Sequence, residues 1–296
     1  MSARTLLCYL LLTLLSLPAQ AAPTEPGTIR VLKVQGSVAL VRESDNTRSD
    51  LAEGALIGQG QRIETGAKSS AILLFSNGTT ITVEQSSNLS VDAFLQDPFD
   101  AENVDFSKIK REPTNSITKI RVGEGSIVGN VAKVNKGSSF DVTTPVGVAG
   151  IRGTIFRIAI SRSGQNFVLN ISLPEGSVVF DSNNGQSLTL QDGTAVTISA
   201  PENNLGSPVT QPVQALPPAE AAAILSQVAE ALGVVVPQPF GPSPQATGTQ
   251  QENQTENTGN QGTSNAGQQL PPSGTGGGSG TGSPSAPNPR QVPPAS

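Results

Sequence analysis

Apolar and polar residues alternate in short segments between residues 28 and 200, as they do in half-buried β-strands. In Thr80–Glu84, for example, Ile81 and Val83 share one face and the polar side chains share the other. Gly, Asn-Gly, Asp-Gly or Pro residues separate these segments, which is typical of turns. Residues 28–200 are therefore predicted to form an all-β domain. Representative strands are expected at Ile29–Val34, Ser37–Arg42, Ala71–Phe75, Thr80–Glu84, Phe140–Thr144, Thr154–Ile160, Phe167–Leu173, Ser177–Phe180 and Ala195–Ile198.

A weak internal repeat runs through the same residues. Gly-Ser stands before an apolar strand at Gly36-Ser37, Gly125-Ser126 and Gly176-Ser177. Repeated strand-turn-strand units fit a solenoid-like stack or a sandwich, in which each unit buries its apolar face on its neighbours. Gly-Ser before a valine is also a common strand opening, so the pattern leaves both interpretations open.

The segment from about Leu95 to Asn115 interrupts this rhythm, because it is rich in charged residues and contains two prolines. It is predicted to be a long surface loop. Long loops in compact domains often carry function, so this loop is a candidate contact surface. A simple insertion is the alternative.

Residues 201–236 shift in composition toward Pro, Gln and Ala, and they include one predicted helix at 218–233. Pro218 suits the first turn, Glu220 suits the helix N-terminus and Gly233 suits its end. A single helix of about 15 residues is marginal in water, so it is expected to dock on the β domain rather than on a partner. Its apolar stripe comprises Ile224, Leu225, Val228, Ala231 and Leu232.

The two ends of the chain have distinct compositions. Residues 1–21 have the pattern of a secretory signal peptide, with an apolar run ending at Leu17 and the A-x-A signal Ala19-Gln20-Ala21. That run is shorter than the roughly 20 residues of a bilayer span, so we expect cleavage rather than a retained anchor. Residues 237–296 consist mostly of Gln, Asn, Gly, Thr, Ser and Pro, and are predicted to form a disordered low-complexity tail.

The amino-acid composition excludes the commonest catalytic mechanisms and zinc sites. The sequence has no His, and its one Cys is Cys8 in the predicted signal peptide. His and Cys are the usual zinc ligands, and His is the commonest general base. Zinc sites, cysteine nucleophiles and Ser-His-Asp triads are thereby excluded, and nothing in the pattern places two carboxylates together. We predict no enzymatic activity, no metal and no cofactor.

Charge and aromatic content narrow the choice of partner. The net charge is −5 and the charges are scattered, whereas nucleic-acid binding needs a basic face. The sequence has no Trp, and its one Tyr is Tyr9 in the predicted signal peptide, which weakens a carbohydrate-binding interpretation based on aromatic platforms. The partner is therefore expected to be a protein.

The most distinctive segment runs from Ser138 to Ile158. A strand ending in Thr-Thr-Pro leads through a Gly/Ala-rich turn into Arg-Gly-Thr-Ile-Phe. The segment resembles the FecR domain, and upstream matches that begin at Gly36-Ser37 extend the resemblance over about residues 35–160. The matching motif positions are Phe140, Val142, Thr144, Pro145, Arg152, Gly153, Thr154 and Phe156.

The motif is interpreted as mainly architectural. Pro145 ends one strand by removing a backbone donor, and Gly147, Gly150 and Gly153 allow close backbone approach or positive φ. Arg152 could bind an anionic ligand or bond strand-end carbonyls, and we expect the second. A phosphate loop is rejected because no Lys-Ser/Thr ending and no helix follow the glycines. The predicted structural motif residues are Phe140, Thr144, Pro145, Gly147, Arg152, Gly153, Thr154 and Phe156.

The resemblance implies a FecR-type domain of stacked β-strands outside the cytoplasm. The best-known family members sit in the inner membrane, where they sense a TonB-dependent transporter and control a sigma factor. This chain shows no second hydrophobic span. It is therefore expected to be periplasmic or secreted to the cell surface, without an integral membrane span after signal cleavage.

The predicted function is that of an exported, non-enzymatic binding module. It would act as a cell-envelope sensor or regulatory protein through contact with an envelope protein, such as an outer-membrane or signalling component. The alternative is a structural or adhesive component of the envelope or surface matrix, tethered by its polar tail.

Overall fold

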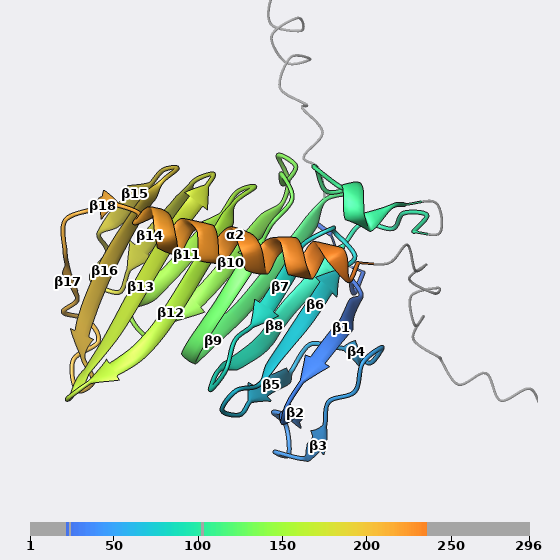
Figure 1. Cartoon of the computed structure of the whole chain (residues 1–296), viewed down its shortest axis with the longest axis horizontal. Coiled ribbons are helices and arrows are strands. Elements are labelled where there is room, and N and C mark those ends of the chain that lie inside the picture. Colours follow the sequence, from blue (N-terminus) through green and yellow to red (C-terminus); the bar gives the residue numbers. More distant parts are fainter. Residues whose placement is uncertain (1–21, 24, 102–103, 236–296) are drawn as a thin grey trace, which may run out of the picture. The chain divides into compact units, whose positions relative to one another are not determined.

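The computed structural model describes residues 22–23, 25–101 and 104–235, and strands dominate them. The predicted signal peptide and the predicted tail lie outside the described residues. The all-β class expected from alternation is confirmed, and the strands build a sandwich of two sheets (Figure 1).

The long strand β9 (Ser116–Asn130) belongs to both sheets, because it pairs with β8 in the first and with β7 in the second. The two sheets are therefore joined by hydrogen bonds through this strand. Neighbouring strands are antiparallel, except that β10 runs parallel to β9. The first sheet has the order β3 (Arg48–Asp50), β2 (Val38–Arg42), β5 (Gln61–Thr65), β8 (Asn88–Gln96), β9, β10 (Ser139–Thr144), β11 (Gly147–Ile151), β14 (Val178–Ser182) and β15 (Ser187–Leu190). The second has the order β4 (Leu56–Ile57), β1 (Ile29–Gln35), β6 (Ser70–Phe75), β7 (Thr80–Val83), β9, β12 (Ile155–Ser163), β13 (Asn166–Glu175) and β16 (Thr194–Pro201), with β17 (Val209–Thr210) and β18 (Gln214–Ala215) on the outer side of β16.

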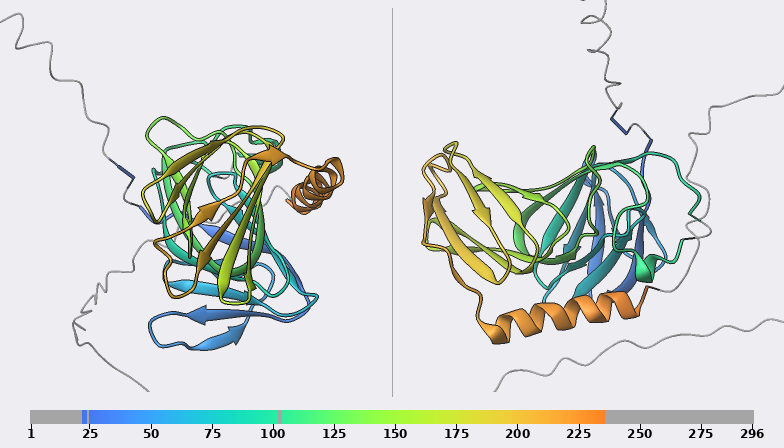
Figure 2. Two further views of the ribbon diagram at one scale, coloured as in Figure 1. Left: turned by 90° about the vertical axis from the view of Figure 1, so that its left-hand side faces the viewer. Right: turned by 90° about the horizontal axis from the view of Figure 1, so that it is seen from above.

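The two sheets face each other (Figure 2). They enclose one core of aliphatic side chains and phenylalanines. The ring of Phe75 on β6 meets that of Phe94 on β8 edge-on, with centroids 5.1 Å apart, so the two sheets touch directly through aromatic side chains. Each fully buried side chain of this size contributes roughly 1.5–3 kcal/mol to folding. No Cys lies among the described residues, so their stability rests on this core rather than on disulfides.

The repeated Gly-Ser pairs mark places where the chain passes from one sheet to the other. Gly36 lies between β1 and β2, Gly125 lies within β9, and Gly176 lies between β13 and β14. Their φ angles are 73°, 82° and 93°, in the region that favours glycine. The backbone N–H groups of Ser37 and Ser126 donate to the hydroxyls of Ser69 and Ser87, at 2.9 and 2.8 Å. Each Gly-Ser pair therefore marks a corner at which the chain leaves one sheet of the sandwich and enters the other.

The Gly/Ala turn predicted within the motif is wrong, because Gly147–Ile151 forms strand β11. The tight turn is made by Pro145 and Val146 alone, and the Thr144 hydroxyl closes it with a 2.8 Å hydrogen bond to the Gly147 carbonyl. Gly147 at the start of β11 allows this strand to lie against Phe180, since a methyl group added there would come within 2.5 Å of that ring.

The predicted loop before β9 is present over residues 97–115, but it is anchored to the body of the protein. It contains the short 3₁₀ helix η2 (Phe106–Lys108), and Phe106 is buried in a small cluster with Leu74 and Val235. Glu112 is also buried, and it accepts a 2.6 Å hydrogen bond from the Ser116 hydroxyl. A freely projecting loop is therefore excluded for the described part of this segment.

Helix α2 (Pro218–Gly233) lies across the outer face of the second sheet, against β7, β9, β12 and β13 (Figure 1). Ile224, Val228 and Ala231 of the predicted apolar stripe are buried, whereas Leu225 is 39% exposed because it lies off the contact face. Docking on the chain's own sheet occurs as expected. No helix in the described part of the chain has the length and apolar character of a membrane span.

Replacing Gly125 by alanine should destabilise the fold by about 2–5 kcal/mol, because positive φ and overlap with the backbone of Ser87 act together. Gly54 is the matched control: its φ is 81° but nothing lies within 4 Å, so Gly54→Ala should cost only about 1–2 kcal/mol. Urea denaturation of both variants measures this difference. An equal loss of unfolding free energy in Gly125→Ala and Gly54→Ala would show that the backbone at Gly125 is not sterically constrained.

Candidate functional site

Three hollows flank α2 where it crosses the second sheet. A polar cleft of about 320 Å³ lies beside β1, β6 and β7. A hollow of about 260 Å³ lies at the N-terminal end of the helix beside β13 and β16, and a groove of about 650 Å³ lies beside the ends of β9 and β12. The helix therefore forms a wall of each candidate binding surface.

Glu84, directly after β7, connects the helix to the sheet. Its carboxylate accepts hydrogen bonds from Gln227 on α2 and from Arg157 on β12, both at 2.8 Å. The Ser126 hydroxyl of β9 also donates to it, and Arg157 in turn donates to Ser126 at 3.1 Å. Four elements distant in sequence thus meet at one carboxylate.

Burial by itself would raise the pKa of Glu84, but the hydrogen bonds from Ser126 and Gln227 and the charge of Arg157 outweigh it. The pKa of Glu84 is therefore lowered, and the carboxylate stays ionised at neutral pH. A carboxylate held in this way fixes α2 on the sheet, and it is poorly suited to accept a proton as a general base.

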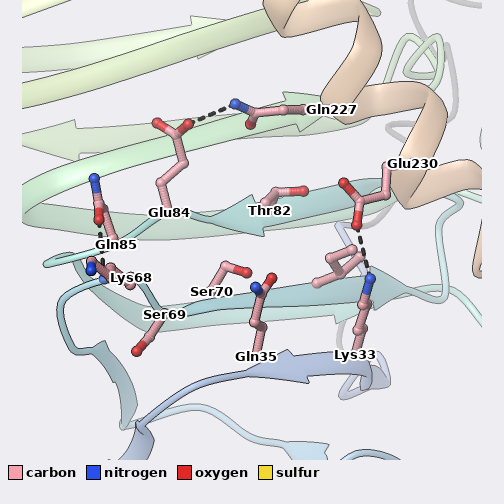
Figure 3. Close-up of a pocket in the computed structure, with 11 residues that line it drawn as sticks. Lys33, Gln35, Lys68, Ser69, Ser70, Thr82, Glu84, Gln85, Gln227 and Glu230 are labelled. Carbon is pink, nitrogen blue, oxygen red and sulfur yellow. Dashed lines mark hydrogen bonds and ion pairs between the residues drawn. The ribbon is translucent and has the colours of Figure 1, made fainter.

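The polar cleft opens between the Glu84 carboxylate and the ion pair of Lys33 with Glu230 (Figure 3). Lys33 on β1 lies 2.9 Å from Glu230 on α2, and the hydrogen bond and charge of Glu230 raise the pKa of Lys33. Gln35, Ser70 and Thr82 line the floor with uncharged polar groups. Since both carboxylates already have cationic or amide partners, the cleft can offer hydrogen bonds to a ligand but no unpaired acid.

The 650 Å³ hollow is called the basic groove, after the lysines on its rim: Lys108, Lys110 and Lys133. Lys110 and Lys133 are held together by the backbone, because the Lys133 N–H donates to the Lys110 carbonyl at 3.0 Å. Apolar side chains line the rest of it: Ile109, Val131, Ile155, Val228 and Leu232.

Part of the predicted motif reaches this groove. Gly153 has a φ of 68°, and Thr154 pairs through its backbone with Val131, at 3.0 and 3.1 Å. The Thr154 hydroxyl donates to the Ser177 carbonyl at 2.9 Å, which ties the motif to the corner before β14. Gly153 and Thr154 both line the basic groove.

The other motif residues lie away from it. Phe140 and Phe156 are fully buried in the core, and the Pro145 carbonyl accepts a 2.8 Å hydrogen bond from the Asn183 side chain. A methyl group at Gly150 would find ordinary contact distances of 3.6 Å or more, so no steric need for glycine exists there.

Arg152 does not make the predicted bond to strand-end carbonyls. Its side chain is exposed, and it has no hydrogen-bond or ion-pair partner among the residues that the structure describes. Arg152 directly precedes Gly153, which lines the basic groove.

Sequence reasoning missed the residues that organise this face: Glu84, Arg157, Gln227, Lys110 and Lys133. Alternation does place Glu84 and Arg157 on the outer face of their strands, and this is the one available signal. It does not reveal that they meet, since they are 73 residues apart. In the described part of the chain, no group of three or more His, Cys, Asp or Glu residues could hold a metal ion.

Comparison with known proteins finds one family. Residues 61–179 match the family described as FecR protein. No curated protein matches the chain. Two crystal structures of a candidate anti-sigma factor from Parabacteroides distasonis ATCC 8503 are similar over 55% of this chain at 15% identity, with TM-scores of 0.38 and 0.39. The similar region covers 63% and 64% of that protein, so the chain spans less than two thirds of its length.

The Glu84 carboxylate should make stability depend on pH. Because its pKa is lower in the folded protein, its contribution is present above the ordinary value of 4.5 and is lost as pH falls through the lowered folded-state value. Glu84→Gln should therefore cost about 1–3 kcal/mol at neutral pH and less at pH 3. Urea denaturation at both pH values checks this. An equal deficit at both pH values would contradict a role for the charge.

Proposed function

Because residues 61–179 form a FecR domain, we propose that this chain is a non-enzymatic binding module of the cell envelope, which senses or regulates by contact with another protein. The FecR match is the observation that carries the proposal. The resemblance noted in the sequence over residues 35–160 and the family match overlap across most of their length, including the whole motif from Phe140 to Phe156.

The surface chemistry supports binding rather than catalysis. Glu84 and Glu230 face the polar cleft, and each is already engaged by a hydrogen-bond or ion-pair partner. The sandwich and its docked helix give a preformed surface with several concave patches, and such surfaces bind with little loss of conformational entropy.

Export and location are parts of the same proposal. The pattern of residues 1–21 supports a cleaved signal peptide, and a mature domain of residues 28–200 would then act in the periplasm or at the cell surface. The proposed partner is an envelope protein, such as an outer-membrane or signalling component.

The composition of residues 237–296 favours a second candidate function. This segment has only Glu252, Glu256 and Arg290 as charged residues, and such a chain can space or tether a domain within a matrix. In that case the β domain would be a structural or adhesive component.

Crosslinking of tagged mature protein in native envelopes, followed by capture, distinguishes the two functions. The sensor function predicts one saturable protein partner, which is also captured by a variant that ends at residue 236. Retention by envelope polymer that is lost with the tail, with no discrete protein captured, would contradict it. Deleting residues 97–115 is not a clean control, because Phe106 and Glu112 are buried.

A further inference from the structure

Cations without acidic partners gather at one place on this acidic protein. Most arginines of the second sheet and its surroundings pair with carboxylates, as Arg157 does with Glu84 and Arg162 does with Glu202. Among the described residues, five exposed cations have no carboxylate within ion-pair distance and either line the basic groove or lie within three residues of one that does: Lys110, Arg111, Lys133, Lys136 and Arg152. Unpaired like charges repel one another, so their accumulation favours an anionic ligand.

The backbone fixes these cations relative to one another. Arg111 forms a parallel bridge with Lys133, and the Glu112 N–H donates to the Lys133 carbonyl at 3.1 Å. A methyl group at Gly153 would lie 3.0 Å from the Lys133 Cα, which places the turn that carries Arg152 beside this bridge. The backbones of three separate segments that carry these cations are therefore held together.

The nearby acid Glu112 is buried and is not exposed on this rim. Its side chain is buried, with 3% relative exposure, and its carboxylate accepts hydrogen bonds from the Ser116 hydroxyl at 2.6 Å and the Asn135 N–H at 2.5 Å. Glu175 is the one acid among the residues that line the groove. The rim thus keeps an excess of positive charge.

The floor of the groove is apolar. Val131 and Val228 are buried at its base, and Ile109, Ile155 and Leu232 are partly buried around them. Its volume of about 650 Å³ is in the usual range for ligand pockets. A recessed apolar floor beneath a cationic rim suits apolar side chains flanked by carboxylates better than it suits the flat plane of a lipid surface.

We propose that the basic groove docks a short acidic, amphipathic segment of a partner protein. Apolar side chains of that segment lie on the floor between η2 and α2, and its carboxylates pair with Lys110, Lys133 and Arg152. This inference rests on the proposed function and gives it a surface and a partner chemistry. The cationic rim would also direct the acidic segment to this groove, since the rest of an acidic protein repels it.

Fluorescence anisotropy with a labelled peptide of about 12 residues, built from alternating Leu and Glu, tests the groove on the full mature chain. We expect binding that weakens as salt is raised from low to physiological ionic strength. Lys110→Glu/Lys133→Glu should weaken it at least about tenfold. The control is Lys119→Glu, which reverses the charge of an exposed, unpaired lysine on the first sheet. It should change the affinity for the peptide by less than about twofold.

Two further probes check the two halves of the site. A Ser/Glu peptide should bind more weakly than the Leu/Glu peptide, and a Leu/Lys peptide should not bind. Equal binding of the Leu/Glu and Ser/Glu peptides, equal effects of the Lys119 and Lys110/Lys133 substitutions, or no binding at all would overturn the proposal. Binding to phosphatidylglycerol vesicles without binding to the peptide would also overturn it, in favour of a lipid.

Thermal unfolding of each variant shows whether it is folded before affinity is compared. The envelope crosslinking experiment, repeated with Lys110→Glu/Lys133→Glu, separates the two proposals. A partner captured equally by wild type and variant would leave the proposed function standing and remove the groove from it. Loss of the partner in this variant, with capture retained in Lys119→Glu, supports both.

Discussion

Strand β9 belongs to both sheets, and the rest of the structure depends on its passage from one to the other. Its first half pairs with β8 and β10, and its second half pairs with β7 and β12. The turn of the strand takes place at Gly125, where φ is 82° and a side chain would overlap the backbone of Ser87. Since the same type of corner recurs at Gly36 and Gly176, glycine at the corners allows one chain to close two sheets over a single core.

A second constraint determines where ligands can approach. Helix α2 buries only a narrow apolar stripe on the sheet, and polar contacts to Glu84, Lys33 and Ser172 complete its docking. A helix held in this way leaves hollows along its sides rather than a flush interface. The polar cleft and the basic groove both follow from this contact, because Gln227 and Glu230 of the helix line the cleft and Val228 and Leu232 line the groove.

The basic groove gives the FecR motif a connection to the surface. Phe140 and Phe156 serve the core, whereas Gly153 and Thr154 lie where the loop before β9 and the helix α2 come together. The exposed Arg152 lies next to them and is available to a partner. The same short segment therefore contributes to both the core and the groove.

The sequence by itself determined the local structure. Alternation in Thr80–Glu84 predicts a strand because successive side chains of an extended chain point to opposite faces, and Pro218 and Gly233 delimit a helix for similarly local reasons. Periodicity does not say which strand lies beside which, and it does not identify the partner of an outward charge. Gly147–Ile151 became a strand because β10 and β14 lie on either side of it, and Lys110 meets Lys133 through backbone pairing. These contacts join residues far apart in the chain, so only the tertiary structure decided the sheet order, the docking of α2 and the basic groove.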